Sequence, residues 1–187
     1  MQIEKTALSG VLVLIPRRHG DARGFFSESW NLRTLAQAGV NLPDFVQDNH
    51  SFSTAVNTLR GLHFQSPPHA QGKLVRCARG RLLDVVVDIR KGSPTYGHWL
   101  GEELSFENGR QLWVPAGFAH GFVTREPDTE IAYKCTDFYA PECDGGIAWD
   151  SVGIDWQLTG APTLSGKDEA AVALADFDSP FIYEEDE

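Results

Sequence analysis

Short apolar segments of strand length recur along the 187-residue chain, and glycine or proline separates most of them. The segment at residues 82–89 reads LLDVVVDI and is rich in β-branched residues, which favour strands. Several short strands joined by Gly and Pro turns are typical of a β-sandwich or barrel. We therefore predict a mostly β fold, with strands at residues 11–15, 73–78, 82–89, 112–114, 121–124 and 130–135.

Helical signals are sparse. In the best candidate, residues 31–38, Leu32, Leu35 and Ala36 fall on one face, and the segment begins with Asn, which can cap a helix, and is followed by Gly, which can end it. A second short helix is possible near residues 167–174. The chain is therefore expected to carry only a few short helices, at the periphery of the β structure.

Length and charge limit the class of protein. The length fits one domain or two small ones, and we place a single domain at residues 1–187. With 26 acidic against 16 basic residues and a net charge of -10, the chain lacks the positive surface of a nucleic-acid binder. No uninterrupted run approaches the ~18 apolar residues of a membrane span. The acidic end at residues 184–187 is interpreted as a solvated, frayed terminus.

Three cysteines are spread along the chain. Cys77, Cys135 and Cys143 are an odd number without a C-x-x-C pair, so the sequence predicts neither a disulfide framework nor a zinc signature. Cys77 and Cys135 fall in strand-like runs and are expected to be buried thiols. A cytoplasmic enzyme is the simplest interpretation.

Residues 60–65, RGLHFQ, place polar groups on one face of a predicted strand. Because side chains alternate along a strand, Leu62 and Phe64 point one way while His63 and Gln65 point the other. His63 could then share a barrel interior with a ligand, and a neutral imidazole can act as a base near neutral pH. A single histidine can equally be a hydrogen-bonded core residue, so this segment alone leaves both interpretations open.

A metal site is another possible use of His63. The run from Gly109 to His120 has the spacing G-x5-P-x-G-x-x-H, which resembles the second motif of the cupin jelly roll. Metal-binding cupins usually carry H-x-H in the first motif, but His63 is followed by Phe64 and Gln65. His63 and His120 alone are too few ligands for a usual site, so we expect neither a metal nor another cofactor.

Basic residues gather around the same strand. Arg60, Lys73 and Arg76 lie in or near it, and Arg23 adds another cation near the N-terminus. A guanidinium matches two phosphate oxygens with two parallel N–H bonds. Arg60 is three residues from His63 and is therefore the best candidate for a phosphate contact.

Ordered motifs cover nearly the whole chain. They are DARGFFSE at residues 21–28, QDNHS at 47–51, LRGLHFQ at 59–65, QGKLV at 71–75, DVVVDIR at 84–90, RQLWVP at 110–115, GFAHGF at 117–122, YKCTD at 133–137, GIDW at 153–156 and LSGKD at 164–168. With these motifs in this order, the chain closely resembles the dTDP-4-dehydrorhamnose 3,5-epimerases. The resemblance implies a cupin-like double-stranded β-helix, or jelly roll, without a cofactor.

The resemblance also implies a reaction and its catalytic residues. Family members epimerise dTDP-4-keto-6-deoxyglucose at C3 and C5, on the way to activated L-rhamnose. The C4 ketone acidifies the protons on both carbons, so a base must remove each proton while the enolate is stabilised. The match implies that His63 is the base, Asp168 its carboxylate partner, Lys73 the cation near the enolate and Tyr133 the acid on the opposite face.

Substrate-binding residues follow from the same resemblance. Arg60 is expected to meet the diphosphate. An N-terminal segment with Arg23, Phe26 and Glu28 is expected to reach the partner's site in a homodimer. The remaining implied contacts with the substrate are Gln47, Asn49, His120 and Tyr139.

Two alternatives remain open from the sequence. The first is a relative that epimerises only C3 or only C5 of a related keto sugar and shares the His, Asp and Tyr. The second is a cupin that binds a sugar nucleotide without turning it over. The complete set of catalytic residues, including Tyr133, favours double epimerisation.

Overall fold

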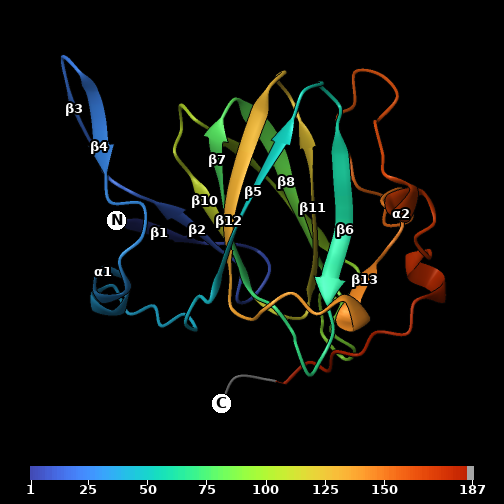
Figure 1. Ribbon diagram of the computed structural model, residues 1–187. Coiled ribbons are helices and arrows are strands. Elements are labelled where there is room, and N and C mark those ends of the chain that lie inside the picture. Colours follow the sequence, from blue (N-terminus) through green and yellow to red (C-terminus); the bar gives the residue numbers. More distant parts are fainter. Residues whose placement is uncertain (185–187) are drawn as a thin grey trace.

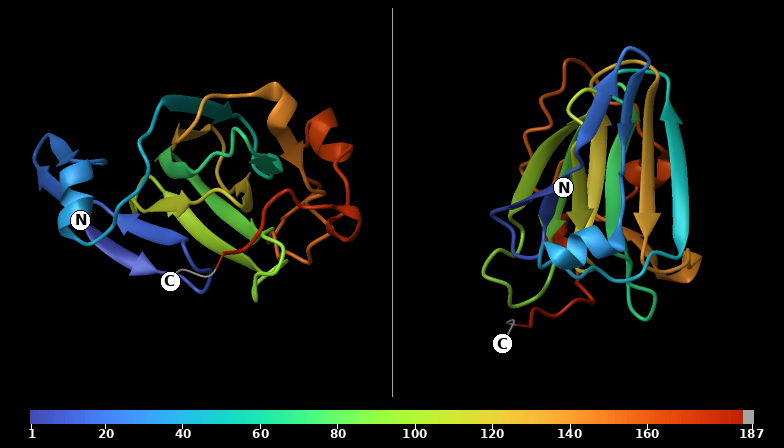
Figure 2. Two further views of the ribbon diagram at one scale, coloured as in Figure 1. Left: turned by 90° about the horizontal axis from the view of Figure 1, so that it is seen from below. Right: turned by 90° about the vertical axis from the view of Figure 1, so that its left-hand side faces the viewer.

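The computed structural model describes residues 1–184 and consists mainly of two antiparallel β-sheets that curve around a common interior (Figures 1 and 2). The expected acidic terminus at residues 184–187 therefore lies, apart from Glu184, outside the described residues. The six-stranded sheet has the order β1 (Gln2–Lys5), β2 (Leu12–Ile15), β10 (Gln111–Val114), β7 (Lys73–Arg79), β12 (Thr129–Cys135) and β5 (Gln47–Ser53). The five-stranded sheet has the order β13 (Asp144–Gly146), β6 (Leu59–Gln65), β11 (Phe118–Thr124), β8 (Arg81–Asp88) and β9 (Trp99–Ser105).

This arrangement confirms the predicted mostly β, jelly-roll fold. Each of the six predicted strands is present, with ends that differ by a few residues. The strands β1, β5, β9 and β13 and a separate hairpin of β3 (Arg18–Asp21) and β4 (Gly24–Ser27) were not predicted, because their sequences are rich in polar residues and lack a clear apolar period.

Strand β8 shows why a continuous apolar run forms the centre of the fold. Its even-numbered residues Leu82 and Val86 belong to the core between the two sheets. Its odd-numbered residues Val85 and Val87 belong to a second core on the outer face of the five-stranded sheet. A strand buried on both faces loses the polar alternation of a surface strand, which accounts for the LLDVVVDI sequence.

The C-terminal part of the chain covers this outer face. Trp156 and Phe181 pack into the second core, and the segment carries the short helices α2 (Gly166–Glu169) and η2 (Leu174–Asp176) (right-hand side of Figure 1). A parallel bridge between Thr58 and Thr163 ties the segment to the start of β6. The segment therefore lies against the outer face of the five-stranded sheet, next to β6.

The helix predicted at residues 31–38 is present as α1 (Leu32–Gln37). The Asn31 side chain accepts hydrogen bonds from two backbone N–H groups of the first turn, as expected of an N-cap. Leu35 is fully buried, but Leu32 is 48% exposed, so the expected apolar face is only partly covered in this chain. The second predicted helix is shorter than expected and consists of α2, followed by η2. No helix in residues 1–184 is long and apolar enough to cross a membrane.

Candidate active site

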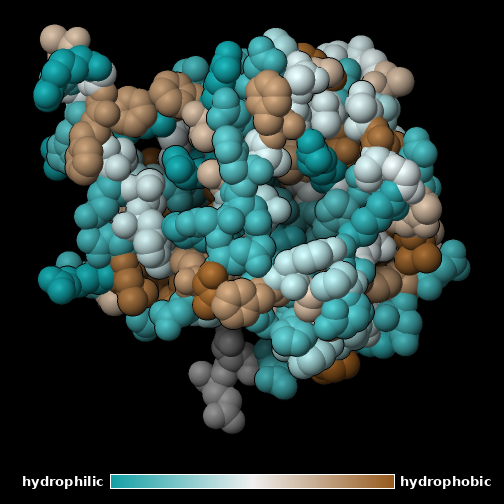
Figure 3. Space-filling model, in the orientation of Figure 1, coloured by the Kyte–Doolittle hydropathy of each residue, from teal (hydrophilic) through white to brown (hydrophobic). Residues whose placement is uncertain are grey.

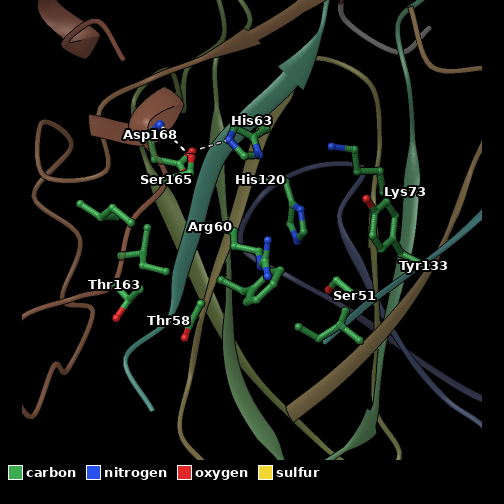
Figure 4. Close-up of a pocket in the computed structure, with 14 residues that line it drawn as sticks. Ser51, Thr58, Arg60, His63, Lys73, His120, Tyr133, Thr163, Ser165 and Asp168 are labelled. Atoms are coloured by element: carbon green, nitrogen blue, oxygen red, sulfur yellow. Dashed lines mark hydrogen bonds and ion pairs between the residues drawn. The ribbon is translucent and has the colours of Figure 1, made fainter. Parts of the chain in front are cut away.

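A cavity of about 370 Å³ opens between the two sheets (Figure 4). Both sheets contribute polar side chains to it, and the C-terminal segment closes one side. The polar residues that line it are Ser51, Thr58, Arg60, His63, Lys73, His120, Tyr133, Thr163, Ser165 and Asp168. Six of the predicted site residues, scattered from residue 60 to residue 168, therefore come together here.

The five-stranded sheet supplies two histidines. His63 on β6 and His120 on β11 are direct cross-strand partners. The two strands approach closely at the neighbouring glycines, because a Cβ on Gly61 would lie 2.6 Å from the Gly121 Cα. A side chain at either position would collide with the backbone of the opposite strand, so this crossing accepts only glycine at both positions.

His63 is engaged by a carboxylate from the C-terminal segment. Its Nε2 lies 2.5 Å from Oδ1 of Asp168, which is only 3% exposed. Ser165 caps α2 and donates its hydroxyl to Oδ2 of Asp168 at 2.7 Å, so this carboxylate is held at both oxygens. With Nε2 donating to Asp168, Nδ1 of His63 retains the lone pair that a base requires.

Burial lowers the pKa of His63 below its ordinary value, and this effect outweighs the charge and the hydrogen bond of Asp168, which raise it. The positive charges of Lys167 and Lys73 lower the pKa further. By itself, the Asp168 carboxylate favours the protonated imidazole. The net effect is the reverse, because desolvation penalises the charged form more strongly. His63 is therefore neutral at pH 7.

The six-stranded sheet supplies Lys73 from β7 and Tyr133 from β12. Both side chains line this cavity and a second one that adjoins it. Burial lowers the pKa of Lys73, with Cys135, its cross-strand partner, opposing that shift. Burial raises the pKa of Tyr133, so the phenol remains a proton donor at neutral pH.

His120 is also paired with a carboxylate. Its Nε2 lies 2.6 Å from Oδ1 of Asp84, a fully buried residue of β8. The other oxygen of Asp84 has no hydrogen-bond partner among the described residues. Asp84 was not singled out in the sequence, although its place inside an apolar strand, at the same parity as Leu82 and Val86, is a signal that could have identified it.

A second cavity of about 440 Å³ adjoins the first and shares His63, Lys73 and Tyr133 with it. Gln47, Asn49 and Tyr139 line this cavity, as their expected roles require. Two more lining residues, Asp144 and Lys167, were not singled out as site residues. Gln65 also lines it, but its side-chain amide forms hydrogen bonds with three backbone groups and so stabilises the surrounding loops.

Three predicted binding residues lie elsewhere in this chain. Arg23, Phe26 and Glu28 belong to the β3–β4 hairpin or follow it, and the hairpin projects away from the barrel (Figure 1). Arg23 pairs with Asp21, and Phe26 is 72% exposed. They therefore do not contribute to the cavity of their own subunit.

Both histidines of the cavity are thus paired with carboxylates. Within residues 1–184, no group of three or more His, Cys, Asp or Glu side chains is arranged to hold a metal ion. Cys77 and Cys135, which were expected to be buried thiols, are buried and free.

Comparison with known proteins gives a consistent result. The family model described as dTDP-4-dehydrorhamnose 3,5-epimerase matches residues 5–176. The enzyme of that name from Salmonella typhimurium is 53% identical over 176 residues, which cover 93% of this chain and 96% of the relative. A crystal structure of dTDP-6-deoxy-D-glucose-3,5-epimerase from Legionella pneumophila, in complex with dTDP-4-keto-L-rhamnose, superimposes with a TM-score of 0.93 at 43% identity and covers 98% of this chain and 99% of that one. A 3'-monoepimerase from Streptomyces bikiniensis, in complex with dTDP-quinovose, superimposes with a TM-score of 0.85 at 34% identity and covers 91% of this chain and 86% of that one.

Proposed function

This chain belongs to the dTDP-4-dehydrorhamnose 3,5-epimerase family, and we propose that its central cavity inverts both C3 and C5 of a dTDP-4-keto-6-deoxy sugar. It is an isomerase that acts on a nucleotide sugar. One observation carries the proposed mechanism: a neutral imidazole and a protonated phenol face the same cavity from opposite sheets. Inversion at carbon requires this arrangement, since a proton returned to the original face regenerates the substrate.

His63 is the base of this mechanism. Nδ1 of the imidazole accepts the proton from C3 or C5, and the electron pair of the broken C–H bond moves toward the C4 oxygen. Asp168 holds the other nitrogen, fixes the tautomer and stabilises the imidazolium that forms. Because Asp168 is itself held by Ser165, the imidazole is positioned before the substrate binds.

Lys73 and Tyr133 complete the proton transfer. The Lys73 amine lines both cavities and is available to the enolate oxygen, where a positively charged donor stabilises the developing negative charge. The Tyr133 hydroxyl then donates a proton to the opposite face of the carbon. The ketone is restored, and the configuration at that carbon is inverted. The His63 imidazolium then releases its proton to solvent and the Tyr133 phenolate takes one up, so that both residues return to their starting states.

The remaining cavity residues bind the substrate. Arg60 donates only to the Phe52 carbonyl at 3.2 Å and to the Ser53 hydroxyl at 3.5 Å, so donors remain for the diphosphate. His120, held by Asp84, lines the cavity beside His63 and contacts the sugar. Gln47, Asn49 and Tyr139 contact the substrate from the second cavity.

Solvent exchange tests the function directly. The purified protein would be incubated with the 4-keto sugar nucleotide in D2O, and deuterium at each carbon would be followed by NMR. Label at both C3 and C5, with conversion to the rhamno-configured product, is expected. Label at one carbon only would show a narrower epimerase, and binding without label would show a protein that recognises the nucleotide sugar but does not turn it over.

We also propose that the chain acts as a homodimer in which the β3–β4 hairpin reaches the partner's cavity. The hairpin carries Phe25 and Phe26, which are 45% and 72% exposed. Apolar surface gathers over this projecting element at the upper left of Figure 3. Exposed aromatic side chains on a projecting hairpin are stabilised when a second copy covers them.

Mixing two inactive variants tests this assembly. One variant carries Arg23→Ala and Phe26→Ala, and the other carries His63→Ala. If the hairpin completes the partner's cavity, subunit exchange creates one intact site per mixed dimer and restores part of the activity. A mixture that stays inactive after verified exchange, or a wild-type monomer in light scattering at micromolar concentration, would overturn the proposal.

A cytoplasmic location is part of the proposal. All three cysteines are free and buried. Free thiols are usual in proteins of a reducing compartment. Cell fractionation with an antibody to the protein would test this location.

A further inference from the structure

The two faces of the β3–β4 hairpin differ. The hairpin forms a sheet of its own, apart from the two large sheets (Figures 1 and 2). In its register Gly20 lies opposite Phe25. Because side chains alternate along a strand, Arg18, two residues before Gly20, shares the face of Phe25, and Phe26 lies on the other face. Phe26 is 72% exposed, whereas the face with Arg18 contacts the barrel.

The turn between β9 and β10 receives this first face. The Arg18 guanidinium donates from Nη1 to the carbonyl of Glu107 at 2.9 Å and from Nη2 to the carbonyl of Phe106. Its central carbon lies 4.2 Å from the centre of the Phe25 ring and 5.5 Å from that of Phe106, and the two rings are 5.6 Å apart. We call Arg18, Phe25 and Phe106 the hairpin anchor. A two-stranded hairpin is only marginally stable by itself, so such contacts are needed to order it.

The turn at residues 106–110 has an internal framework that does not depend on the hairpin. Oδ1 of Asn108 accepts hydrogen bonds from the backbone N–H groups of Ser105 and Arg110, both at 3.0 Å. The backbone of Gly109 runs so close to the anchor that a Cβ there would lie 2.7 Å from Nε of Arg18. The turn therefore offers a preformed surface against which one guanidinium fits closely.

Building on the homodimer proposed above, we propose that Arg18 is a positioning residue for the site of the partner subunit. The anchor holds the hairpin on its own barrel, so that Phe26 and Arg23 are presented outward to the second copy. A segment that is ordered before it binds loses less conformational entropy on binding. Arg18 does not have to touch the substrate for this role. Its effect falls on substrate binding, because the hairpin residues that it orients are binding residues.

Two variants remove the anchor from its two sides. Arg18→Met keeps the aliphatic stem but lacks the cation and its donors, and Phe106→Ala removes the ring on the barrel side. Each should raise KM about tenfold, as the loss of charged hydrogen bonds predicts. The value of kcat should stay nearly unchanged, because the lost contacts bind ground state and transition state alike. Arg18→Lys retains the charge without the planar fork and should give an intermediate KM.

Arg79→Met is the matched control. The Arg79 side chain is 62% exposed, lies 3.9 Å from the Glu130 carboxylate and is not among the residues that line the two cavities. This variant should leave KM unchanged. A tenfold rise in the control as well would show that KM responds to any lost surface cation, and would overturn the assignment to the anchor.

A heterodimer shows in which subunit Arg18 acts. Arg18→Met and His63→Ala subunits would carry different affinity tags, and the mixed dimer would be purified through both. Its one cavity with an intact His63 belongs to the Arg18→Met subunit and receives the unaltered hairpin of the other subunit. The wild-type KM is therefore expected. A KM that stays raised would place the effect within the subunit of Arg18 and overturn the inference, as would an unchanged KM in the Arg18→Met homodimer.

The outcomes also separate this inference from the proposed function. If the wild-type protein exchanges no deuterium at C3 or C5, the proposed epimerisation is refuted, and calorimetry with dTDP replaces KM. The heterodimer then combines Arg18→Met with Arg60→Ala, which removes the diphosphate contact from the cavity of the other subunit. Wild-type affinity at the remaining site supports the inference, and weakened binding overturns it. A monomeric wild-type protein overturns both the assembly and this inference.

Discussion

His63 and Tyr133 face one cavity from opposite sheets, His63 from β6 of the five-stranded sheet and Tyr133 from β12 of the six-stranded sheet (Figure 4). The two strands are not neighbours in either sheet, so a ligand in the cavity lies between a proton acceptor and a proton donor. In the proposed mechanism this arrangement allows proton removal on one face of the carbon and proton donation on the other, and the roles of the two residues can be tested separately.

Tyr133→Phe should separate proton removal from inversion. The variant keeps the ring but lacks the hydroxyl that donates on the opposite face. Net epimerisation is expected to fall by about 10²–10⁴-fold, the usual contribution of a positioned acid. Exchange in D2O with retained configuration should continue, because His63 still removes the proton. Turnover at the wild-type rate would exclude Tyr133 as the acid.

Asp168→Asn should disable the base without removing it. An amide in this position can donate to Nε2 of His63, which would move the imidazole proton to Nδ1 and occupy the lone pair that faces the substrate. We expect kcat to fall about 10²–10⁴-fold with little change in KM, as measured by NMR of product formation. Ser165→Ala removes only the support of Asp168 and should have a smaller effect. Equal losses in the two variants would contradict this ranking.

The pH profile should show a base with a lowered pKa. Burial stabilises the neutral imidazole of His63, so kcat/KM should decline only below pH ~6.5, the ordinary value for histidine. The unfolded chain has the ordinary pKa. Below that value it binds more protons than the folded chain, so the contribution of His63 to the free energy of unfolding is full above pH ~6.5 and is lost as the pH falls through the lowered pKa. Exchange rates measured from pH 5 to 8 test the first point, and an inflection above 6.5 would contradict it.

The sequence predicted the fold class because strand β8 and its neighbours carry strong apolar patterns. It could not predict the β3–β4 hairpin from apolar periodicity, since residues 18–21 and 24–27 are mostly exposed in this chain. Short strands with polar faces depend on pairing with a neighbour, which a local pattern does not encode.

For the candidate site, alternation along β6 correctly placed His63 on a face different from that of Leu62 and Phe64. Alternation along a strand could not identify Asp168 as the partner of His63, because 105 residues separate the two. Only the family resemblance linked them. Asp84, Asp144 and Lys167 were missed as site residues, since their importance depends on tertiary contacts: a buried carboxylate beside His120 and an ion pair across β13 and α2.

We expect the close approach of β6 and β11 to be required for both stability and activity. Gly61 has φ +120°, and a Cβ there would lie 2.6 Å from the Gly121 Cα and 2.7 Å from the His120 carbonyl oxygen. Gly61→Ala is therefore expected to destabilise the protein by about 3 kcal/mol, because β6 must move away from β11. Gly39→Ala is the matched control, since Gly39 also has a positive φ, +79°, but a Cβ there meets nothing within 4 Å.

In urea unfolding, Gly39→Ala should lower the free energy of unfolding by only about 1 kcal/mol, because alanine disfavours the left-handed backbone conformation. Gly61→Ala should also lower kcat at temperatures where it remains folded, because His63 and His120 share this crossing and would shift apart. A similar loss of stability in both variants, with normal kcat in Gly61→Ala, would show that the strands can separate without disturbing the histidines. The close contact of the two glycines would then have no part in positioning the base.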